Sequence, residues 1–320
     1  MAEPFRSPLS RRDALRLGAI AGAGLTLWRP LLAAEESTPG EASLMRPIPS
    51  SGEKLPVIGL GTNRYGVTEP ADLAALRDVL RKMPSLGGTV IDTAPAYGRS
   101  EVVLGDLLAE LANRDRFFLA TKVTSDTDDG KDGVAMMEES FRRLKTKRID
   151  LMQVHSLQGV EALLPILHGW KKEGRIRYVG ITTSRTEAHA RMAEIMGQHP
   201  LDFIQVDYSL GNRAAAEKVL PLAQEKKIAV LVNMPLGGRR AENLLSKVAG
   251  RELPPWAAET GASSWPQLFL KYVVAHPAVT CAIPGTTKVE HLVDNLSAAR
   301  GALPDAAARK KMEQYWDGLR

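Results

Sequence analysis

The chain has 320 residues, of which 44% are hydrophobic and 25% are charged, which is typical of an ordinary globular protein. The formal net charge is +5, and five arginines against two acidic residues in the first 34 positions account for three of these charges. The remainder therefore lacks the strong basic field of a nucleic-acid binder, and we expect no nucleic-acid partner. The single cysteine, Cys281, excludes an internal disulfide, and its apolar neighbours indicate a buried strand residue.

The first 34 residues contain, in the right order, the features of a bacterial twin-arginine (Tat) export signal. Arg11 and Arg12 precede an apolar stretch at 18–28 that is too short to span a membrane, and small residues follow at 33–34. An amphipathic or disordered tail is the alternative. We expect a Tat-like signal peptide at 1–34, a flexible linker at 35–45 and the folded domain at 46–320. The Tat machinery would then be a transient partner, and the destination would be the periplasm or another exported location.

From about residue 56, short apolar runs alternate with longer amphipathic stretches. Stretches with helical spacing include 70–83, 133–145, 160–172 and 264–276. The apolar runs have the length and composition of buried strands, at 57–61, 89–92, 117–122, 150–155, 178–182, 203–207, 228–233 and 279–283. Eight such units predict an α/β fold, a single-domain (β/α)8 TIM barrel, with an open doubly wound sheet as the alternative.

Three consecutive predicted strands end in a polar residue: Asp92, Lys122 and His155. Tyr97 stands in the loop after the first of them. Taken singly, these residues have ordinary explanations as a turn cap, a solvated charge, a structural histidine and a packed aromatic. Because the carboxyl ends of barrel strands meet at one rim, we expect all four side chains to lie together.

That set suits the reduction of a carbonyl group. Hydride addition to a carbonyl carbon leaves an alkoxide that needs a proton, and a phenol beside an ammonium group is an improved proton donor. Lys122 would supply the ammonium, Asp92 would hold Lys122 in its charged form, and a neutral His155 would orient the carbonyl oxygen by a hydrogen bond.

Motifs along nearly the whole domain, from about 46 to 300, resemble those of the aldo-keto reductase family. They occur in the family's order at 59–62 (GLGT), 91–98 (IDTAPAYG), 121–122 (TK), 150–155 (DLMQVH), 174–181 (GRIRYVGI), 204–209 (IQVDYS), 235–237 (PLG) and 283–286 (IPGT). The resemblance implies that Asp92, Tyr97, Lys122 and His155 form a catalytic tetrad with Tyr97 as proton donor. It also implies a monomer with a nicotinamide nucleotide lying across the barrel mouth.

The resemblance further implies a set of cofactor contacts. Thr182, Thr183 and Gln205 match the residues that hold the nicotinamide carboxamide, and Asn233 falls where many members have an aromatic that stacks on the nicotinamide ring. The full set that the resemblance implies is Gly61, Thr62, Asp92, Thr182, Thr183, Gln205, Asn233, Leu236, Thr286, Lys288, His291 and Asn295.

The segment that would bind the adenosine-phosphate end of the nucleotide departs from the pattern of NADPH-preferring family members. Those members often carry Lys and Arg where this chain has Gly285 and His291. Lys288 could supply one of those charges, and Arg239 and Arg240 could close over the pyrophosphate or be solvated loop residues. We expect NADPH as the cofactor, with NADH as the alternative.

Three functions remain open at this point. The first is reduction of an aldehyde or ketone substrate, and the second is a nucleotide-binding sensor or regulatory homologue with little turnover. The third, a metal hydrolase, is disfavoured because the rim offers one histidine and one clear aspartate, so we expect no metal site. Loops 123–132 and 234–262 are the expected source of substrate specificity. Trp256 and Trp265 could line the pocket, with a packing role as the equal alternative.

Export is open to a direct test. Replacing both Arg11 and Arg12 with lysine should keep the full-length protein in the cytoplasm, because the twin-arginine pair is the part of the signal that is recognised. Cell fractionation measures this, with the unaltered chain as the control. An unchanged distribution would show that the leader is not a Tat signal.

Overall fold

The computed structural model describes residues 42–238 and 243–319. The expected signal peptide, most of the expected linker, Arg239 and Arg240 lie outside these residues. Within them, no helix is long and apolar enough to cross a membrane. Leu44 and Met45, which the sequence assigned to the linker, belong to the folded unit, since the Leu44 amide donates to the carbonyl of Ala299 and Met45 begins a strand.

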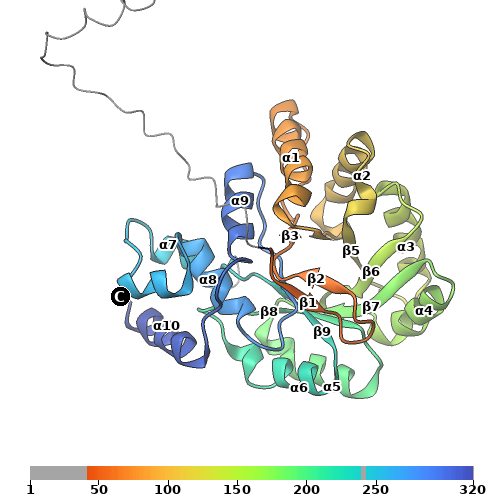
Figure 1. Ribbon diagram of the computed structural model, residues 1–320. Helices are drawn as coiled ribbons and strands as arrows, with labels where there is room; N and C mark the ends of the chain where they lie inside the picture. Colours follow the sequence, from red (N-terminus) through yellow and green to blue (C-terminus); the bar gives the residue numbers. More distant parts are fainter. Residues whose placement is uncertain (1–41, 239–242, 320) are drawn as a thin grey trace, which may run out of the picture. The chain divides into compact units, whose positions relative to one another are not determined.

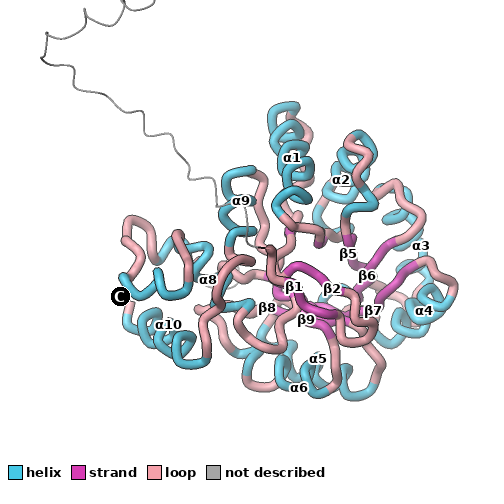
Figure 2. The backbone as a smooth tube through the Cα atoms, viewed as in Figure 1, coloured by secondary structure: helices cyan, strands magenta, loops and turns pink. Residues whose placement is uncertain are grey.

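Eight parallel strands form the centre of the fold (Figures 1 and 2). Each strand pairs with the next one in the sequence, as expected for repeated strand–helix units. In chain order they are β3 (Leu60–Gly61), β4 (Val90–Asp92), β5 (Phe118–Val123), β6 (Ile149–Val154), β7 (Ile176–Thr182), β8 (Phe203–Asp207), β9 (Ala229–Asn233) and β10 (Cys281–Ala282). The predicted (β/α)8 barrel is confirmed.

The sheet closes between its first and last strands. Parallel bridges join Ile58 to Ala282 and Gly61 to Gly285, and the amide of Gly61 donates to the carbonyl of Pro284 at 3.1 Å. A Cβ on Gly61 would lie 2.8 Å from the carbonyl oxygen of Ile283, which is closer than real Cβ atoms approach. A side chain at this position would therefore force the closing strands apart.

Helices surround the strands (Figure 1). Among the residues that the structure describes, eight α-helices follow the barrel strands in turn, and two are additional. The eight are α1 (Pro70–Lys82), α2 (Ser100–Glu110), α3 (Lys131–Arg143), α4 (Val160–Lys172), α5 (His189–Gln198), α6 (Val219–Glu225), α8 (Trp265–Val274) and α9 (Val289–Ser297). The additional helices are α7 (Leu244–Lys247) in the long segment after β9 and α10 (Ala306–Gly318) at the end of the chain.

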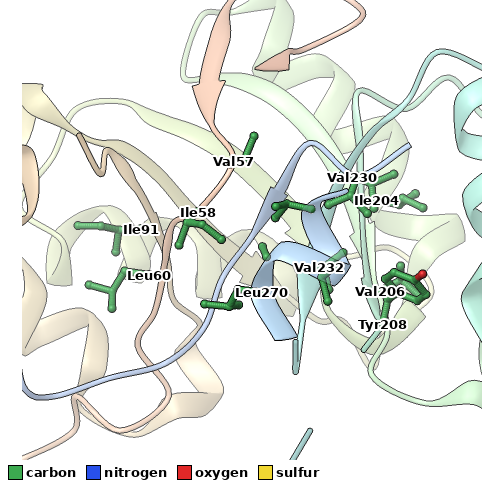
Figure 3. Packing of buried hydrophobic residues seen from close by; sticks show 14 of the residues in the cluster. Val57, Ile58, Leu60, Ile91, Ile204, Val206, Tyr208, Val230, Val232 and Leu270 are labelled. Atoms are coloured by element: carbon green, nitrogen blue, oxygen red, sulfur yellow. The ribbon is translucent and has the colours of Figure 1, made fainter. Parts of the chain in front are cut away.

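Alternate strand residues face opposite sides, and this separates two apolar clusters. Outward residues such as Val232 of β9 pack with helix residues such as Leu270 of α8, and Figure 3 shows part of this cluster. Inward residues such as Phe118, Tyr178 and Phe203 form the second cluster, inside the barrel. Cys281 is a buried strand residue, as predicted, and it belongs to this interior cluster. Burial raises the pKa of its thiol.

A hairpin that the sequence analysis did not anticipate covers the amino-terminal end of the barrel. It consists of β1 (Met45–Pro47) and β2 (Lys54–Pro56), paired antiparallel. Ile48 and Leu55 of the hairpin join the interior cluster, and the Tyr178 hydroxyl on β7 donates to Glu53 at 2.6 Å. The interior is therefore capped at this end.

Close helix packing gives a stability prediction at Gly105 of α2. A Cβ there would lie 2.0 Å from the carbonyl oxygen of Arg143, so Gly105→Ala should destabilise the fold by about 3 kcal/mol, the upper end of overpacking costs. Gly169 of α4 is the matched control, because its Cβ would meet nothing within 4 Å. Gly169→Ala should stabilise by about 0.5–1 kcal/mol through helix propensity. Urea unfolding measures both, and equal effects of the two substitutions would contradict the packing argument.

Candidate active site

A layer of polar side chains lies above the apolar interior, at the carboxyl ends of the strands. Its members point inward by strand alternation. Four of them come two residues after a member of the interior apolar cluster, and Thr182 comes two residues after Gly180. Each is at most 2% exposed: Asp92, Lys122, Gln153, Thr182 and Gln205.

The ammonium group of Lys122 is fully hydrogen-bonded in this layer. It donates to Asp92 Oδ2 at 2.6 Å, to the carbonyl of Thr93 at 2.8 Å and to Tyr97 Oη at 3.3 Å. An ammonium has three protons to donate, so no donor is left over. The structure thus brings together three of the four predicted tetrad residues through one nitrogen.

Lys122 is held in its charged form despite its burial. Burial alone would lower the pKa of Lys122, but the Asp92 carboxylate and the Tyr97 phenol outweigh it, and the pKa lies above its ordinary value. A permanent positive charge therefore stands beside the Tyr97 oxygen.

The Asp92 carboxylate accepts three hydrogen bonds. Its Oδ1 accepts from Gln205 Nε2 at 2.7 Å and from Gln153 Nε2 at 3.2 Å, while Oδ2 accepts from Lys122. Gln153 is not among the predicted site residues, although its place on β6, two residues before His155, puts it on the same inward face. Three charge-assisted hydrogen bonds stabilise the carboxylate.

The loop that carries Tyr97 is fixed at both ends by buried hydroxyl groups. Thr62 Oγ1 donates to the carbonyl of Asp92 at 2.9 Å, and Ser100 Oγ donates to the carbonyl of Thr62 at 3.0 Å. The hydroxyls of Thr93 and Ser100 lie 2.9 Å apart. Tyr97 ends a 3-10 helix, η3 (Pro95–Tyr97), and is half-buried, so its phenol is positioned yet reachable from the rim.

His155 lies beside Tyr97 at the end of β6. The two rings meet edge to face, with centroids 6.2 Å apart. His155 begins the 3-10 helix η5 (His155–Leu157), in which Ser156 and Leu157 both have positive φ, at 54° and 60°. Two consecutive non-glycine residues in the left-handed region are rare and cluster at functional sites.

The residues predicted to hold the nicotinamide end lie next to this centre. Thr182 Oγ1 donates to Gln205 Oε1 at 3.2 Å, and Asn233 Nδ2 donates to the carbonyl of Thr183 at 3.0 Å. Thr182, Thr183, Gln205 and Asn233 therefore form one connected group across the ends of β7, β8 and β9.

The other predicted contacts at the barrel mouth have visible structural roles. Gly61 is at the closing seam, and the Thr62 hydroxyl is fully buried in the network that fixes the Tyr97 loop. Leu236 is half-buried and packs against the outer apolar cluster.

The residues predicted to bind the adenosine-phosphate end surround the start of α9. Lys288 is the exposed residue immediately before the helix, its amide donates to Thr286 Oγ1 at 3.1 Å, and His291 is exposed in the first turn. Asn295 lies further along and is buried. An exposed helix amino terminus flanked by a lysine is an environment suited to an anion.

The two tryptophans expected near the substrate differ in their surroundings. Trp265 lines a cavity of about 540 Å³ with Leu245, Arg251 and neighbouring residues, and its Nε1 donates to the carbonyl of Arg251. Trp256 packs instead against Tyr315 of α10, with ring centroids 5.5 Å apart.

Comparison with known proteins agrees with this geometry. A model of the aldo/keto reductase family matches residues 57–313. The methylglyoxal reductase YeaE of Escherichia coli is 30% identical, over 81% of this chain and 93% of its own length. The uncharacterised oxidoreductase YqkF of Bacillus subtilis is 28% identical, over 79% and 90%.

Solved structures show the same relationship. An aldo/keto reductase from Klebsiella pneumoniae in complex with NADP and acetate has a TM-score of 0.63 and 27% identity, covering 83% of this chain and 93% of its own. Another from the same organism in complex with NADPH has a TM-score of 0.67 and 25% identity, covering 86% and 95%. The chain belongs to the aldo/keto reductase family and is an oxidoreductase, which confirms the family expected from its motifs.

The buried Asp92–Lys122 pair gives a stability prediction. Lys122→Met or Asp92→Asn alone should each destabilise the fold by about 3–5 kcal/mol, because each leaves a buried group without its partner. The double variant should cost much less than the sum of the two, as measured by urea unfolding at neutral pH. Additive costs would contradict a coupled pair.

The pH dependence follows from the raised pKa of Lys122. The stability that the charged lysine contributes should be fully present below the ordinary lysine pKa and should be lost as the pH rises through the raised, folded-state value. The difference between wild type and Lys122→Met should therefore shrink only at strongly alkaline pH.

Proposed function

We propose that this protein reduces an aldehyde or ketone to an alcohol with NADPH, using Tyr97 as the proton donor. The observation that supports this most directly is the Lys122 ammonium, which is shared between the Asp92 carboxylate at 2.6 Å and the Tyr97 phenol at 3.3 Å. A charge in this place stabilises the phenolate that remains after proton transfer.

Each residue has a defined part in the reaction. A reduced nicotinamide held at the barrel mouth would supply hydride to the carbonyl carbon. Tyr97 Oη then gives its proton to the developing alkoxide, and Lys122 stabilises the resulting phenolate while Asp92 keeps Lys122 in place. His155, beside the Tyr97 ring, orients the carbonyl oxygen. Tyr97 is half-buried, so water can restore its proton at the rim.

The residues of the rim fit a nicotinamide nucleotide. Hydroxyl and amide groups at the ends of β7, β8 and β9 match the hydrogen bonds of a carboxamide. The amino terminus of α9 with Lys288 suits a phosphate. Complexes of the Klebsiella pneumoniae relatives with NADP and NADPH favour NADPH over NADH, and titration with both nucleotides measures the preference directly.

The relatives also guide the choice of substrates. The methylglyoxal reductase of Escherichia coli makes methylglyoxal the first compound to test, within a panel of small aldehydes and ketones. The competing function is a nucleotide-binding sensor or regulatory homologue with little turnover. It predicts tight NADPH binding without oxidation of NADPH by any member of the panel.

Tyr97→Phe should lower kcat by about 10²- to 10⁴-fold, because it removes the proton donor, together with one of the three acceptors of the Lys122 ammonium. NADPH binding should be unchanged. The assay is the loss of NADPH absorbance with the carbonyl panel, using protein without residues 1–41.

Tyr65→Phe is the matched control for this substitution. Tyr65 is fully buried, and its hydroxyl has no hydrogen-bond partner among the described residues, so its removal should leave turnover intact. Equal turnover by wild type and Tyr97→Phe would exclude Tyr97 as the proton donor. Absence of turnover in the wild type with retained nucleotide binding would favour the sensor function.

A further inference from the structure

Asn233 occupies the top of the barrel interior. Inward positions on β9 are Ala229, Leu231 and then Asn233, so its side chain lies one layer above the apolar interior. Its Nδ2 donates to the carbonyl of Thr183, at the end of β7, although β8 lies between β7 and β9 in the sheet. The side chain therefore reaches across β8, the strand that carries Gln205.

The hydrogen bond to Thr183 defines the orientation of the Asn233 amide. Only the nitrogen of this side chain can donate to a carbonyl, so Oδ1 points away from Thr183. That oxygen is buried and has no hydrogen-bond partner in the part of the chain that the structure describes. A buried acceptor left without a donor is costly, and a ligand that supplies a donor recovers that cost.

The side-chain amide of Gln205, unlike that of Asn233, has hydrogen-bond partners at both its nitrogen and its oxygen. Its Nε2 donates to Asp92 and its Oε1 accepts from Thr182, so both ends of its amide are already engaged. Gln205 is the residue that the family resemblance assigns to the carboxamide of the nicotinamide. Gln153 Oε1, in the same polar layer, and Asn233 Oδ1 are both buried without a donor among the described residues, and of these two residues only Asn233 belongs to the group predicted to hold the nicotinamide end.

The backbone next to Asn233 also constrains it. Met234 follows with a φ of 51°, a left-handed conformation that residues other than glycine seldom adopt. Ser156 and Leu157, which follow His155 at the other side of the site, also have positive φ. Strain of this kind persists where the surroundings hold a side chain in one orientation.

We propose that Asn233 Oδ1 accepts a hydrogen bond from the NH2 of the nicotinamide carboxamide, so that the ring is held by a polar contact in place of aromatic stacking. This inference rests on the proposed function, because it requires that the barrel mouth binds a nicotinamide nucleotide. Its consequence is specificity: recognition depends on the carboxamide NH2, which carries the donor, and not only on the carboxamide oxygen.

The test compares NADP⁺ with its 3-acetylpyridine analogue, which keeps the carbonyl oxygen and has a methyl group in place of the NH2. Isothermal titration calorimetry gives both dissociation constants without any catalytic step. Wild-type protein should bind NADP⁺ about five- to tenfold more tightly than the analogue, the effect of one neutral hydrogen bond. Asn233→Leu should bring this ratio close to one. Asn233→Ala serves as a second variant should the leucine variant unfold.

Asn113 provides a matched control elsewhere in the fold. Its Nδ2 also donates to a backbone carbonyl, that of Leu80, at 3.2 Å, and its Oδ1 is likewise buried without a partner among the described residues. It precedes β5, at the opposite end of the strands from the tetrad. Asn113→Leu should leave the ratio of the two dissociation constants as in the wild type.

The outcomes separate the two proposals. A ratio that stays the same in Asn233→Leu and Asn233→Ala, with NADP⁺ still bound, would overturn the role of Asn233 and leave the proposed function intact. Equal dissociation constants of the wild-type protein for NADP⁺ and the analogue would also overturn the role of Asn233 and leave the proposed function intact. Failure of the wild type to bind either nucleotide would overturn the proposed function together with this inference.

Discussion

The ammonium group of Lys122 inside the barrel is the constraint on which the rest of the site depends. A charge that is 1% exposed is stable only with an opposite charge and a full set of acceptors around it. Asp92, the carbonyl of Thr93 and the phenol of Tyr97 provide these acceptors, and two glutamine amides in turn stabilise Asp92. Moving any one of these groups would leave another buried and unsatisfied, so the geometry that stabilises the fold is also the geometry that the proposed role of Tyr97 requires.

The barrel architecture makes such a site possible by dividing its interior into two parts. Aromatic and aliphatic side chains fill the lower part, and the β1–β2 hairpin covers the amino-terminal end. Polar side chains occupy the next layer up, where the strands end. The polar layer therefore faces the carboxyl-terminal rim, and the low-dielectric interior below strengthens the interactions of the charged pair.

Rigid supports surround the reacting groups. The hydroxyls of Thr62, Thr93 and Ser100 join the end of β4 to the start of α2, and so hold the loop that carries Tyr97. On the other side, left-handed residues follow both His155 and Asn233. A site built from strand ends with such supports needs little rearrangement to bind a nucleotide and a small carbonyl compound, which is how preorganised sites stabilise a transition state.

The sequence by itself determined the eight strand–helix units and the meeting of Asp92, Lys122 and His155 at one rim, because both follow from local apolar periodicity and from where each run ends. Only the tertiary structure decided which groups contact them. Gln153 is one polar residue in an apolar run, and nothing local indicates that its amide reaches Asp92, 61 residues away in the sequence. The hairpin and the closing seam at Gly61 likewise depend on partners distant in the chain. The orientation of the Asn233 amide depends on a carbonyl two strands away, since hydrogen bonds across a closed barrel are set by the register of its strands and not by the order of residues along one of them.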